Sequence, residues 1–578
     1  MTTTPAIALH DVSFRYPGAD EDTLRNVNLT IDTADFVTVV GGNGSAKTTL
    51  CKTFNGLVPH YWSGDFAGVA EVCGIDTYTS NVAELSSRVG YVYQDFMNQL
   101  VRPTVRDEIS FSPINFGMPD HAERTAEALE MLRITDLADR FVWQLSGGEG
   151  HLTALASVLA MRPEIIVVDE PVAELDPARA LEIYERLEVL NQQHGITVVT
   201  IEHHAEFIAQ FAKSVVLMDQ GSPVWHLPVQ EAVNRSSQLE AHGIPAPQVV
   251  QAVQALAYDQ SPRTVKDAAQ LIGPAVATLQ SDAVADQEEQ AAQRPVVAAA
   301  SKVHHSYRTV KSSLQPVLNG LDLQVHRGDR IALVGGNGSG KTTLLKLLSG
   351  IMVARQGEIQ VNGVNTRSRS AARLSEHAAY LWQHPQQMFL KESIEADIAL
   401  YPKERKVADW QHLVQHTLQQ VRLTQFAHRD GRSLSGGQQR RATLAIGLAM
   451  QPTLLLLDEP TASLDITSRD AVISMLDELS DVIASAVVAT HDMSLVSEWA
   501  NRVVVLRNGQ VAADLTPRAL FDYPELLAEA HLVPPQIAQL GQAVGLSPAP
   551  LSVAEFIARF QPDELVGTGW TKSVGVKQ

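Results

Sequence analysis

The sequence predicts an α/β protein built from two copies of one unit, each with a mainly parallel sheet. Three motifs recur in the same order in both halves of the chain. GGNGSAKTTL at Gly41–Leu50 recurs as GGNGSGKTTL at Gly335–Leu344, LSGGEG at Leu145–Gly150 as LSGGQQ at Leu434–Gln439, and IIVVDEP at Ile165–Pro171 as LLLLDEP at Leu454–Pro460. The copies are 294, 289 and 289 residues apart, so one unit was duplicated with few insertions.

Each unit alternates segments typical of strands and helices. The first opens with strand-like alternation and a turn, IALHDVSFRYPGAD, and a buried strand, DFVTVVGG or RIALVGG, then runs into the Gly-rich motif. Helical stretches such as AERTAEALEMLRI follow, then LSGG, the apolar strand ending in Asp-Glu, and a third strand, ITVVTIEHH or ASAVVATHD. Strands that alternate with helices indicate a mainly parallel sheet.

Composition and charge narrow the class of protein. Of 578 residues, 45% are apolar and 19% charged, which is ordinary for a globular protein of two to four domains. We expect no transmembrane segment, because no window reaches about 18 uninterrupted apolar residues, and the start MTTTPAIALHDVSF lacks the pattern of a secretory signal. The two cysteines, Cys51 and Cys73, exclude a disulfide scaffold and a Cys-rich zinc site and fit a reducing cytosol. A net charge of −20 without a basic block argues against a nucleic-acid partner.

The Gly-rich motif of the second unit has the pattern G-x-x-x-x-G-K-T directly after a strand. Its glycines let backbone N–H groups close around phosphate oxygens, and the start of the following helix adds partial positive charge. Lys341 is placed to reach the β- and γ-phosphates of ATP, and the Thr342 hydroxyl to bind Mg²⁺. The predicted loop residues are Gly335, Asn337, Gly338, Ser339, Gly340, Lys341, Thr342 and Thr343.

The first unit departs from this pattern at one position, because Ala46 replaces the final glycine. Either the loop tolerates the methyl group, or a Cβ near the phosphates weakens the site. We expect a functional but altered site, since the other motif residues are retained. Its predicted loop residues are Gly41, Asn43, Gly44, Ser45, Ala46, Lys47, Thr48 and Thr49, of which Thr48 is a candidate Mg²⁺ ligand.

An Asp-Glu pair ends an apolar strand in each unit, where a side chain faces the ligand crevice of an open α/β sheet. Asp169 and Asp458 suit Mg²⁺, directly or through water, and Glu170 and Glu459 suit polarising the attacking water. His203 and His491 end the next strand and are candidates to sense the γ-phosphate and hold that water, although a strand-end histidine can also be structural. His204 neighbours His203, so the assignment in the first unit could shift by one residue.

LSGG between a phosphate loop and an Asp-Glu strand is a specific combination. On these motifs the chain resembles the ATP-binding-cassette (ABC) ATPases, and the two units together cover nearly its whole length. The resemblance implies an ATPase that uses ATP and Mg²⁺. In each cassette it implies a RecA-like P-loop core, an antiparallel β subdomain and a helical subdomain.

The family's head-to-tail pairing implies two composite sites, each combining one cassette's phosphate loop with the other's LSGG helix. One would combine Lys47, Asp169, Glu170 and His203 with Ser435, Gly436, Gly437 and Gln438. The other would combine Lys341, Asp458, Glu459 and His491 with Ser146, Gly147, Gly148 and Glu149.

Further residues match positions that the family uses. Tyr16 and Tyr307 lie where an aromatic side chain stacks on adenine, although either could be a core strand residue. Gln94 and Gln383 match the glutamine that links Mg²⁺ to the transport partner. Asp176 and Asp465 match the Leu-Asp loop after the Asp-Glu strand.

Two departures predict unequal sites. Glu149 places an acid where glutamine is usual, and ELD at Glu174–Asp176 replaces the usual SLD found at Ser463–Asp465.

The segment YQDFMNQLVRPTVRDEISFSPINFG is similar to the ATPases of energy-coupling-factor importers, and QHPQQMFLKESIEADIAL less closely so. This resemblance implies partners, namely a membrane coupling subunit and a membrane subunit that captures a vitamin or metal ion. It implies a location on the cytoplasmic face of the membrane, with coupling helices received near Gln94–Leu100 and Gln383–Leu390. The alternatives are a tandem cassette protein that acts on ribosomes or DNA, and the motor of an exporter.

We expect four segments. Residues 1–235 and 298–520 form the two nucleotide-binding domains. Residues 236–297 form a helical extension and a flexible, acidic, Ala-rich linker, and residues 521–578 form a second helical extension whose PPQI echoes APQV of the first.

Overall fold

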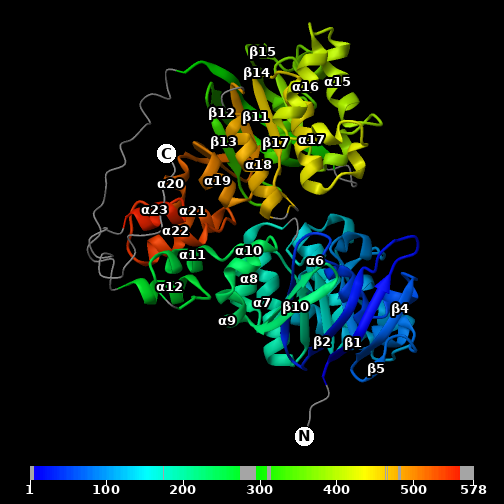
Figure 1. The fold of residues 1–578 in the computed structure, drawn as a ribbon. Helices are drawn as coiled ribbons and strands as arrows, with labels where there is room; N and C mark the ends of the chain where they lie inside the picture. The colour runs from blue at the N-terminus through cyan, green and yellow to red at the C-terminus, as the bar shows by residue number, and fades with distance from the viewer. Residues whose placement is uncertain are drawn as a thin grey trace. The chain divides into compact units, whose positions relative to one another are not determined.

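The computed structural model describes residues 5–172, 175–258, 260–273, 294–308, 314–462, 464, 466–479 and 483–559. The chain forms two compact units, Met1–Ala268 and Ala269–Gln578, which Figure 1 colours from blue to green and from green to red. The predicted linker lies largely in residues 274–293, outside the described part, as does the end of the second extension from residue 560.

Two sheets form the framework of the first unit. The antiparallel sheet has the order β2-β1-β4-β5, and the main sheet has the order β10-β9-β3-β8-β7-β6. The strands are β1 (Ile7–Arg15), β2 (Leu24–Ile31), β3 (Phe36–Val40), β4 (Asp65–Val72), β5 (Ile75–Asp76), β6 (Val89–Val92), β7 (Ile165–Asp169), β8 (Thr197–Ile201), β9 (Ser214–Asp219) and β10 (Ser222–Pro228). In the main sheet every neighbouring pair is parallel except β9 and β10.

Complete burial explains why the central strands read as unbroken apolar runs. All five residues of β3, β7 and β8 are buried, as expected for parallel strands covered on both faces. Register pairs Phe36 with Val198 and Ile165 with Thr197. The carboxyl ends of β3, β7 and β8 therefore lie side by side at one edge of the sheet.

The helices of the first unit fall into three groups. Near the phosphate loop lie α1 (Lys47–Phe54), α2 (Leu57–His60) and α3 (Val82–Ser86). The helical subdomain holds α4 (Val105–Asn115), α5 (His121–Met131) and α6 (Gly147–Leu159), with short 3-10 turns between. The remainder are α7 (Pro177–His194), α8 (Ala205–Phe211), α9 (Val229–Asn234), α10 (Ser236–Ala241), α11 (Gln248–Ala255) and α12 (Val265–Ile272). The helices of the subdomain pack on one another, α4 against α5 and α6.

The second unit repeats both sheets with the same strand orders, β12-β11-β14-β15 and β16-β17-β18-β13-β19-β20. Its strands are β11 (Val296–Arg308), β12 (Leu314–His326), β13 (Arg330–Val334), β14 (Gln356–Val361), β15 (Val364–Asn365), β16 (Ala378–Leu381), β17 (Leu454–Asp458), β18 (Ser485–Ala489), β19 (Arg502–Arg507) and β20 (Gln510–Leu515). The predicted fold of two cassettes, each with a P-loop core, an antiparallel sheet and a helical subdomain, is confirmed.

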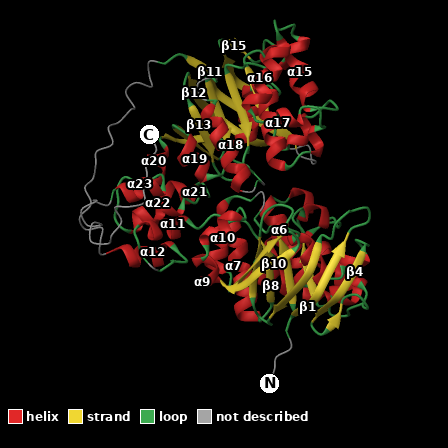
Figure 2. Ribbon diagram, viewed as in Figure 1, coloured by secondary structure: helices red, strands yellow, loops and turns green. Residues whose placement is uncertain are grey.

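The helices of the second unit follow the same plan (Figure 2). They are α13 (Lys341–Leu348), α14 (Ala371–Leu374), α15 (Ile394–Glu404), α16 (Trp410–Gln420), α17 (Gly436–Ala449), α18 (Ile466–Glu478), α19 (Met493–Trp499), α20 (Pro517–Phe521), α21 (Pro524–Glu529), α22 (Gln536–Ala543) and α23 (Val553–Ala558). Figure 1 shows α15, α16 and α17 together and α20–α23 beside α19. Within the described ranges, no helix is both long and apolar enough to cross a bilayer.

Candidate nucleotide-binding sites

A phosphate loop joins strand to helix in each unit, between β3 and α1 and between β13 and α13. The first glycine of each loop has a positive φ, 146° at Gly41 and 142° at Gly335. A Cβ at either position would lie 2.3 Å from a backbone oxygen, that of Met218 or of Leu506. Only glycine fits, because the loop runs directly against the next strand.

The lysine of each loop is buried and bonds to the loop itself. Lys47 Nζ donates to the Gly41 and Gly42 carbonyls at 2.8 and 3.0 Å, and Lys341 Nζ to the Gly335 carbonyl at 2.6 Å. The hydroxyls of the loop serines, Ser45 and Ser339, are buried without a hydrogen-bond partner. A buried donor without a partner at a helix N-terminus fits an anionic ligand, so both loops are suited to a phosphate group.

The aspartate that ends each Asp-Glu strand is buried beside the loop threonine. Thr342 Oγ1 donates to Asp458 Oδ1 at 3.1 Å, and Thr48 bonds Asp169 in the first unit. Burial raises the pKa of both aspartates. A cation would offset this desolvation, and a hydroxyl beside a carboxylate is a donor pair suited to Mg²⁺.

Each of these aspartates also has a tyrosine partner, which the sequence analysis missed. Tyr91 donates to Asp169 Oδ2 at 3.1 Å and Tyr380 to Asp458 Oδ2 at 2.8 Å. The two tyrosines are 289 residues apart, the offset of the other motifs. That repeat, three residues before each predicted glutamine, was the signal that could have identified them.

No described cluster of three or more His, Cys, Asp or Glu side chains could hold a metal ion alone.

The glutamate of each pair meets the predicted histidine. His203 Nε2 lies 3.2 Å from Glu170 Oε1, and His491 Nδ1 lies 3.0 Å from Glu459 Oε2. Both glutamates have a positive φ, 51° and 48°, a strained conformation that tends to occur at functional sites. Pairing with Glu459 raises the pKa of His491 against the opposing effect of burial.

The predicted glutamines differ between the units. The Gln94 amide donates to Glu170 Oε2 at 2.5 Å, so the structure joins Gln94, Glu170 and His203 in one group. Gln383 is half-buried after β16.

The rings of His203 and His204 face two different carboxylates, and one of them belongs to a buried acid that sequence reasoning missed. Glu202 is 2% exposed and accepts from the Tyr184 hydroxyl at 2.7 Å and from both histidine N–H groups. His204 Nδ1 lies 2.7 Å from the same carboxylate. The His204 ring therefore faces Glu202, and the His203 ring faces Glu170.

The LSGG serines are the N-caps of α6 and α17. Each begins a capping box, Ser146 with Glu149 and Ser435 with Gln438, which satisfies N–H groups at the helix start. Gly147 and Gly436 open the two helices, followed by Gly148 and Gly437. Their N-termini are suited to an anion, although in the first unit that anion would lie near a carboxylate.

Tyr16 and Tyr307 occupy matching places beside the loops. Their hydroxyls lie 3.2 Å from Thr49 Oγ1 and Thr343 Oγ1. Tyr307 is 42% exposed, so its ring is accessible rather than part of the core. Both stay predicted adenine-stacking residues.

Comparison with known proteins identifies the family. The family model of the ABC transporters matches residues 24–173 and 318–462, which together make up about half of the chain. The chain belongs to the ABC transporter family. A Methanosarcina mazei protein described as an ABC transporter ATP-binding protein is 31% identical over 554 residues, covering 93% of each chain. One from Caldanaerobacter subterraneus is 29% identical, covering 96% of this chain and 98% of the relative.

One solved structure shares the fold of most of this chain. An archaeal ribosome recycling factor, solved with a ribosomal stalk protein, matches 89% of this chain and 92% of its own with a TM-score of 0.56 and 17% identity. CbiO1 of Clostridium perfringens, part of an ABC transporter complex, matches 41% of this chain and 94% of its own with a TM-score of 0.37 and 26% identity. Family membership makes this chain an ATPase with two ABC cassettes.

Ala46 fits the first ABC cassette without narrowing its phosphate loop. It has φ 75° immediately before α1, and its side chain packs against the apolar core that includes Leu24. A Cβ on the matching Gly340 would instead lie 2.7 Å from Leu318 Cδ2. The methyl group thus points toward the antiparallel sheet, and the lysine bonds match in the two loops.

The negative charge of Glu149 is balanced by a partner within its own cassette. Its carboxylate accepts from Arg140 at 2.7 Å and from the Ser146 hydroxyl at 2.9 Å. These bonds lower the pKa of Glu149 despite its partial burial. The carboxylate of Glu149 therefore accepts a hydrogen bond from the hydroxyl of Ser146, the LSGG serine of the first cassette.

The two helices that begin at the LSGG motifs, α6 and α17, also differ in their contacts. In the second cassette, Gln439 donates to the Leu434 carbonyl at 3.0 Å and Arg440 to the Trp382 carbonyl at 3.2 Å. In the first, Gly150 and His151 take these positions. His151 is 1% exposed, neither ring nitrogen has a hydrogen-bond partner, and its ring lies 4.8 Å from that of Phe96.

Asp176 caps α7 by accepting from the Arg179 N–H at 3.0 Å, a structural role that does not exclude the predicted one. Asp465, Glu174 and Ser463 lie outside the described residues.

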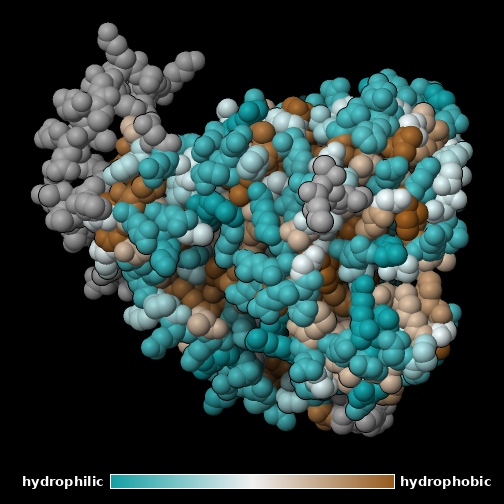
Figure 3. Space-filling model, turned by 90° about the horizontal axis from the view of Figure 1, so that it is seen from below, coloured by the Kyte–Doolittle hydropathy of each residue, from teal (hydrophilic) through white to brown (hydrophobic). Residues whose placement is uncertain are grey.

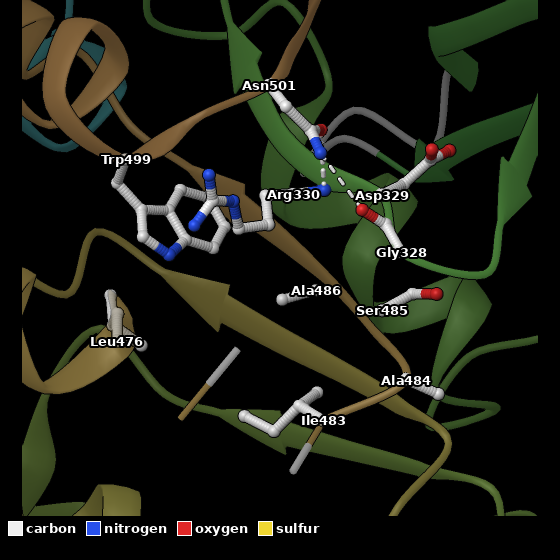
Figure 4. Close-up of a pocket in the computed structure, with 10 residues that line it drawn as sticks. All are labelled: Gly328, Asp329, Arg330, Leu476, Ile483, Ala484, Ser485, Ala486, Trp499 and Asn501. Atoms are coloured by element: carbon white, nitrogen blue, oxygen red, sulfur yellow. Dashed lines mark hydrogen bonds between the residues drawn. The ribbon is translucent and has the colours of Figure 1, made fainter. Parts of the chain in front are cut away.

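A pocket of about 190 Å³ lies at the opposite ends of the second cassette's strands (Figure 4). It is lined by Asp329 and Arg330 at the start of β13, by Ser485 at the start of β18 and by Trp499. Ligands of open α/β sheets bind at the carboxyl ends of strands, so this pocket is not the nucleotide site.

Ala46 and Gly340 precede the two loop lysines, and substituting each by the other's residue should have opposite effects on stability. Ala46→Gly should raise the melting temperature by about 2–4 °C, because it relieves left-handed strain of about 1 kcal/mol. It should change ATP affinity less than about twofold, since the methyl group of Ala46 points toward the antiparallel sheet and not into the space enclosed by the loop. Gly340→Ala should instead cost about 2 kcal/mol or more through the clash with Leu318. Thermal unfolding and ATP titration measure both; a large gain in ATP affinity for Ala46→Gly would show that the methyl group weakens the first site.

His151 should make the first cassette sensitive to acid. Burial lowers its pKa from 6.5 to about 4, so the unfolded chain takes up a proton between these values that the folded chain does not. The stability is complete above pH 6.5 and is lost as the pH falls, by about 2 kcal/mol at pH 5. Urea unfolding of the parent and of His151→Phe at pH 7 and pH 5 isolates this effect. An equal loss in both proteins would contradict it.

Proposed function

We propose that this chain is the ATP-hydrolysing motor of a membrane transporter, an importer of the energy-coupling-factor type that carries a vitamin or a metal ion. The observation that carries the proposal is the predicted ATPase residue set of both cassettes together with exposed apolar side chains along the glutamine loop, several in the first cassette and Leu390 in the second. Membrane subunits would bind these loops and hold the chain at the cytoplasmic face of the membrane.

The glutamine loop of the first cassette exposes apolar side chains. Tyr93 is 37%, Met97 41% and Val101 64% exposed, and in the second cassette Leu390, which matches Val101, is 69% exposed. The face drawn in Figure 3 is mostly hydrophilic, with hydrophobic residues gathered in small areas. Exposed apolar side chains beside a glutamine that is predicted to link Mg²⁺ to the transport partner favour a protein partner that responds to the nucleotide state.

The helical subdomain of the first cassette adds further exposed apolar residues. Phe141 and Trp143 stack at 4.7 Å between ring centroids, and Phe116 is 44% exposed. At the matching positions the second cassette has the charged residues Asp430, Arg432 and Arg405. The two cassettes therefore offer different surfaces, which favours two different coupling segments.

Within each site the side chains take separate tasks. Lys47 and Lys341 would leave the loop carbonyls for the β- and γ-phosphates, at little cost because one set of oxygen acceptors replaces another. Bound Mg²⁺ would offset phosphate charge, and Asp169 or Asp458 with its threonine would hold it.

The water that attacks the γ-phosphate would be oriented by the glutamate and histidine of the same site. Glu170 and Glu459 have left-handed backbones, with φ 51° and 48°, and His203 and His491 lie within 3.2 Å of their carboxylates. The carboxylate would accept a hydrogen bond from the water, and the histidine would hold that carboxylate in place. Gln94 would connect Glu170 to the partner's loop.

The cycle follows from the family's head-to-tail pairing. ATP binding would close the cassettes, and closure would move the membrane subunits. Hydrolysis and release of ADP and phosphate would open the cassettes again. Covalent linkage of the two cassettes makes their encounter intramolecular, with an effective concentration on the order of millimolar.

Glu459→Gln tests this cycle. It keeps the size of the side chain and removes the negative charge, so ATP should still bind while hydrolysis falls by about a hundredfold or more. The variant should remain closed with ATP, as measured by distance between spin labels on the two cassettes. Glu478→Gln, which lies on the exposed end of α18, is the matched control and should cycle as the parent does. A variant that stays open with ATP would contradict the cycle.

Purification from membranes tests the transporter assignment. The tagged chain should be recovered with integral membrane proteins, and Met97→Asp with Val101→Asp should weaken that recovery at least about fivefold, because a charge in an apolar contact costs more than 1 kcal/mol. Val224→Asp, exposed on β10, is the control for surface charge. Recovery with ribosomes alone would reject the transporter in favour of the ribosome-acting class.

A further inference from the structure

The helical extension of each cassette contacts the phosphate loop of the same cassette. In the first, the backbone oxygen of His242, directly after α10, would lie 3.5 Å from a Cβ on Gly42. In the second, the oxygen of Ala530, directly after α21, would lie 3.6 Å from a Cβ on Gly336. The two copies of the unit have thus kept this contact at nearly the same distance.

The turn that makes this contact has one geometry in both copies. The Ile244 N–H donates to the Leu239 carbonyl, and the Leu532 N–H to the Leu527 carbonyl, both at 2.9 Å. Such a helix end requires a left-handed residue. That residue is Gly243 in the first cassette, with φ 80°, and His531 in the second, with φ 56°.

His531 brings its side chain close to Gly336, whereas at Gly42 of the first loop only the backbone oxygen of His242 comes within 4 Å of a Cβ. The Cδ2 of His531 would lie 3.1 Å from a Cβ on Gly336, closer than any other atom of the extension. A left-handed conformation is unfavourable for a residue with a side chain. What sets His531 apart from other left-handed helix ends, such as Lys406, is that its imidazole lies beside the phosphate loop.

The second extension is anchored to the strands that carry the loop. Leu520, Phe521 and Leu527 share one core with Val334, the last residue before the loop, and with Val505 of β19. The chain also joins β19 to α21 through the Arg507–Glu529 ion pair. The oxygen of the preceding Leu506 faces the first loop glycine. Movement of the extension would therefore shift the loop.

We propose that His531 is a positioning residue for the second phosphate loop. Its imidazole restricts the positions that the backbone of Gly336 can take, and the extension thereby influences the ATP affinity of the second site. The first extension has no such side chain at the matching position, Gly243, so it does not act on the first site in this way. A partner that moves the extension would alter ATP binding at one site only. The inference rests on the assignment of this loop as a nucleotide site.

His531→Gly separates positioning from stability. It relieves backbone strain, so the melting temperature should stay the same or rise. It also frees Gly336, so affinity for a fluorescent ATP analogue with Mg²⁺ should fall about threefold to tenfold at the second site, measured in a Lys47→Ala background. In the otherwise unchanged chain, KM for ATP should rise while kcat stays within about twofold. A raised melting temperature with unchanged ATP affinity would overturn the proposal.

Lys406→Gly is the matched control. Lys406 is the left-handed residue, φ 55°, of an identical helix end after α15, where the Val407 N–H donates to the Pro402 carbonyl at 2.9 Å. Its replacement relieves the same strain away from the phosphate loop, so it should raise the melting temperature and leave ATP affinity unchanged. An affinity loss equal to that of His531→Gly would assign the effect to general loosening and overturn the proposal.

A double-mutant cycle tests the contact directly. Gly336→Ala should weaken binding of the ATP analogue in the parent, and His531→Gly should recover part of that loss by removing the crowded atom. Additive losses would overturn the contact. Lys341→Ala in the same background should abolish binding; if it does not, the nucleotide site itself is wrongly assigned, whatever His531→Gly does.

Discussion

The buried parallel pairing of three strands positions the candidate ATPase side chains of each cassette. In the first unit, β3, β8 and β7 are paired in register and fully buried, so the phosphate loop, the histidine and the Asp-Glu pair leave the sheet at one edge. A shift of one residue would turn Asp169 away from Thr48 and toward the opposite face. The apolar strands thus fix the positions of polar residues that have little intrinsic tendency to lie together.

This constraint explains how much the sequence could predict. Motif residues at strand ends were assigned because an apolar run shows where the strand stops, and the second copy confirmed the spacing. The Tyr91–Asp169 bond could not be derived, since it joins neighbouring strands 78 residues apart in the chain. Glu202 was missed because its carboxylate accepts hydrogen bonds from the backbone N–H groups of the two histidines that follow it. The spacing of residues in a sequence does not reveal such backbone hydrogen bonds. The Arg140–Glu149 pair was missed for a related reason: the acid looked unfavourable until its partner was placed.

The asymmetry of the two halves is more local than their sequences suggest. Ala46 and Glu149 both looked like damage to a nucleotide site, yet the methyl group of Ala46 packs on apolar core and Glu149 is bonded by Arg140 and Ser146. The larger differences lie around them. The signature helix of the second cassette is tied by Gln439 and Arg440, whereas that of the first rests on Phe96 through an uncharged His151.

Duplication makes such differences informative. Both copies keep a backbone oxygen of the extension against the second loop glycine, so that contact belongs to the shared design of the unit. Only one copy replaces the left-handed glycine with histidine, and it does so beside a loop whose function needs exact backbone placement. Left-handed residues with side chains also end other helices of this chain, such as Lys406, so the backbone conformation alone assigns no role to His531. What distinguishes His531 is that its imidazole lies beside Gly336 of the phosphate loop, and on that contact we base the proposal that the extension influences nucleotide binding.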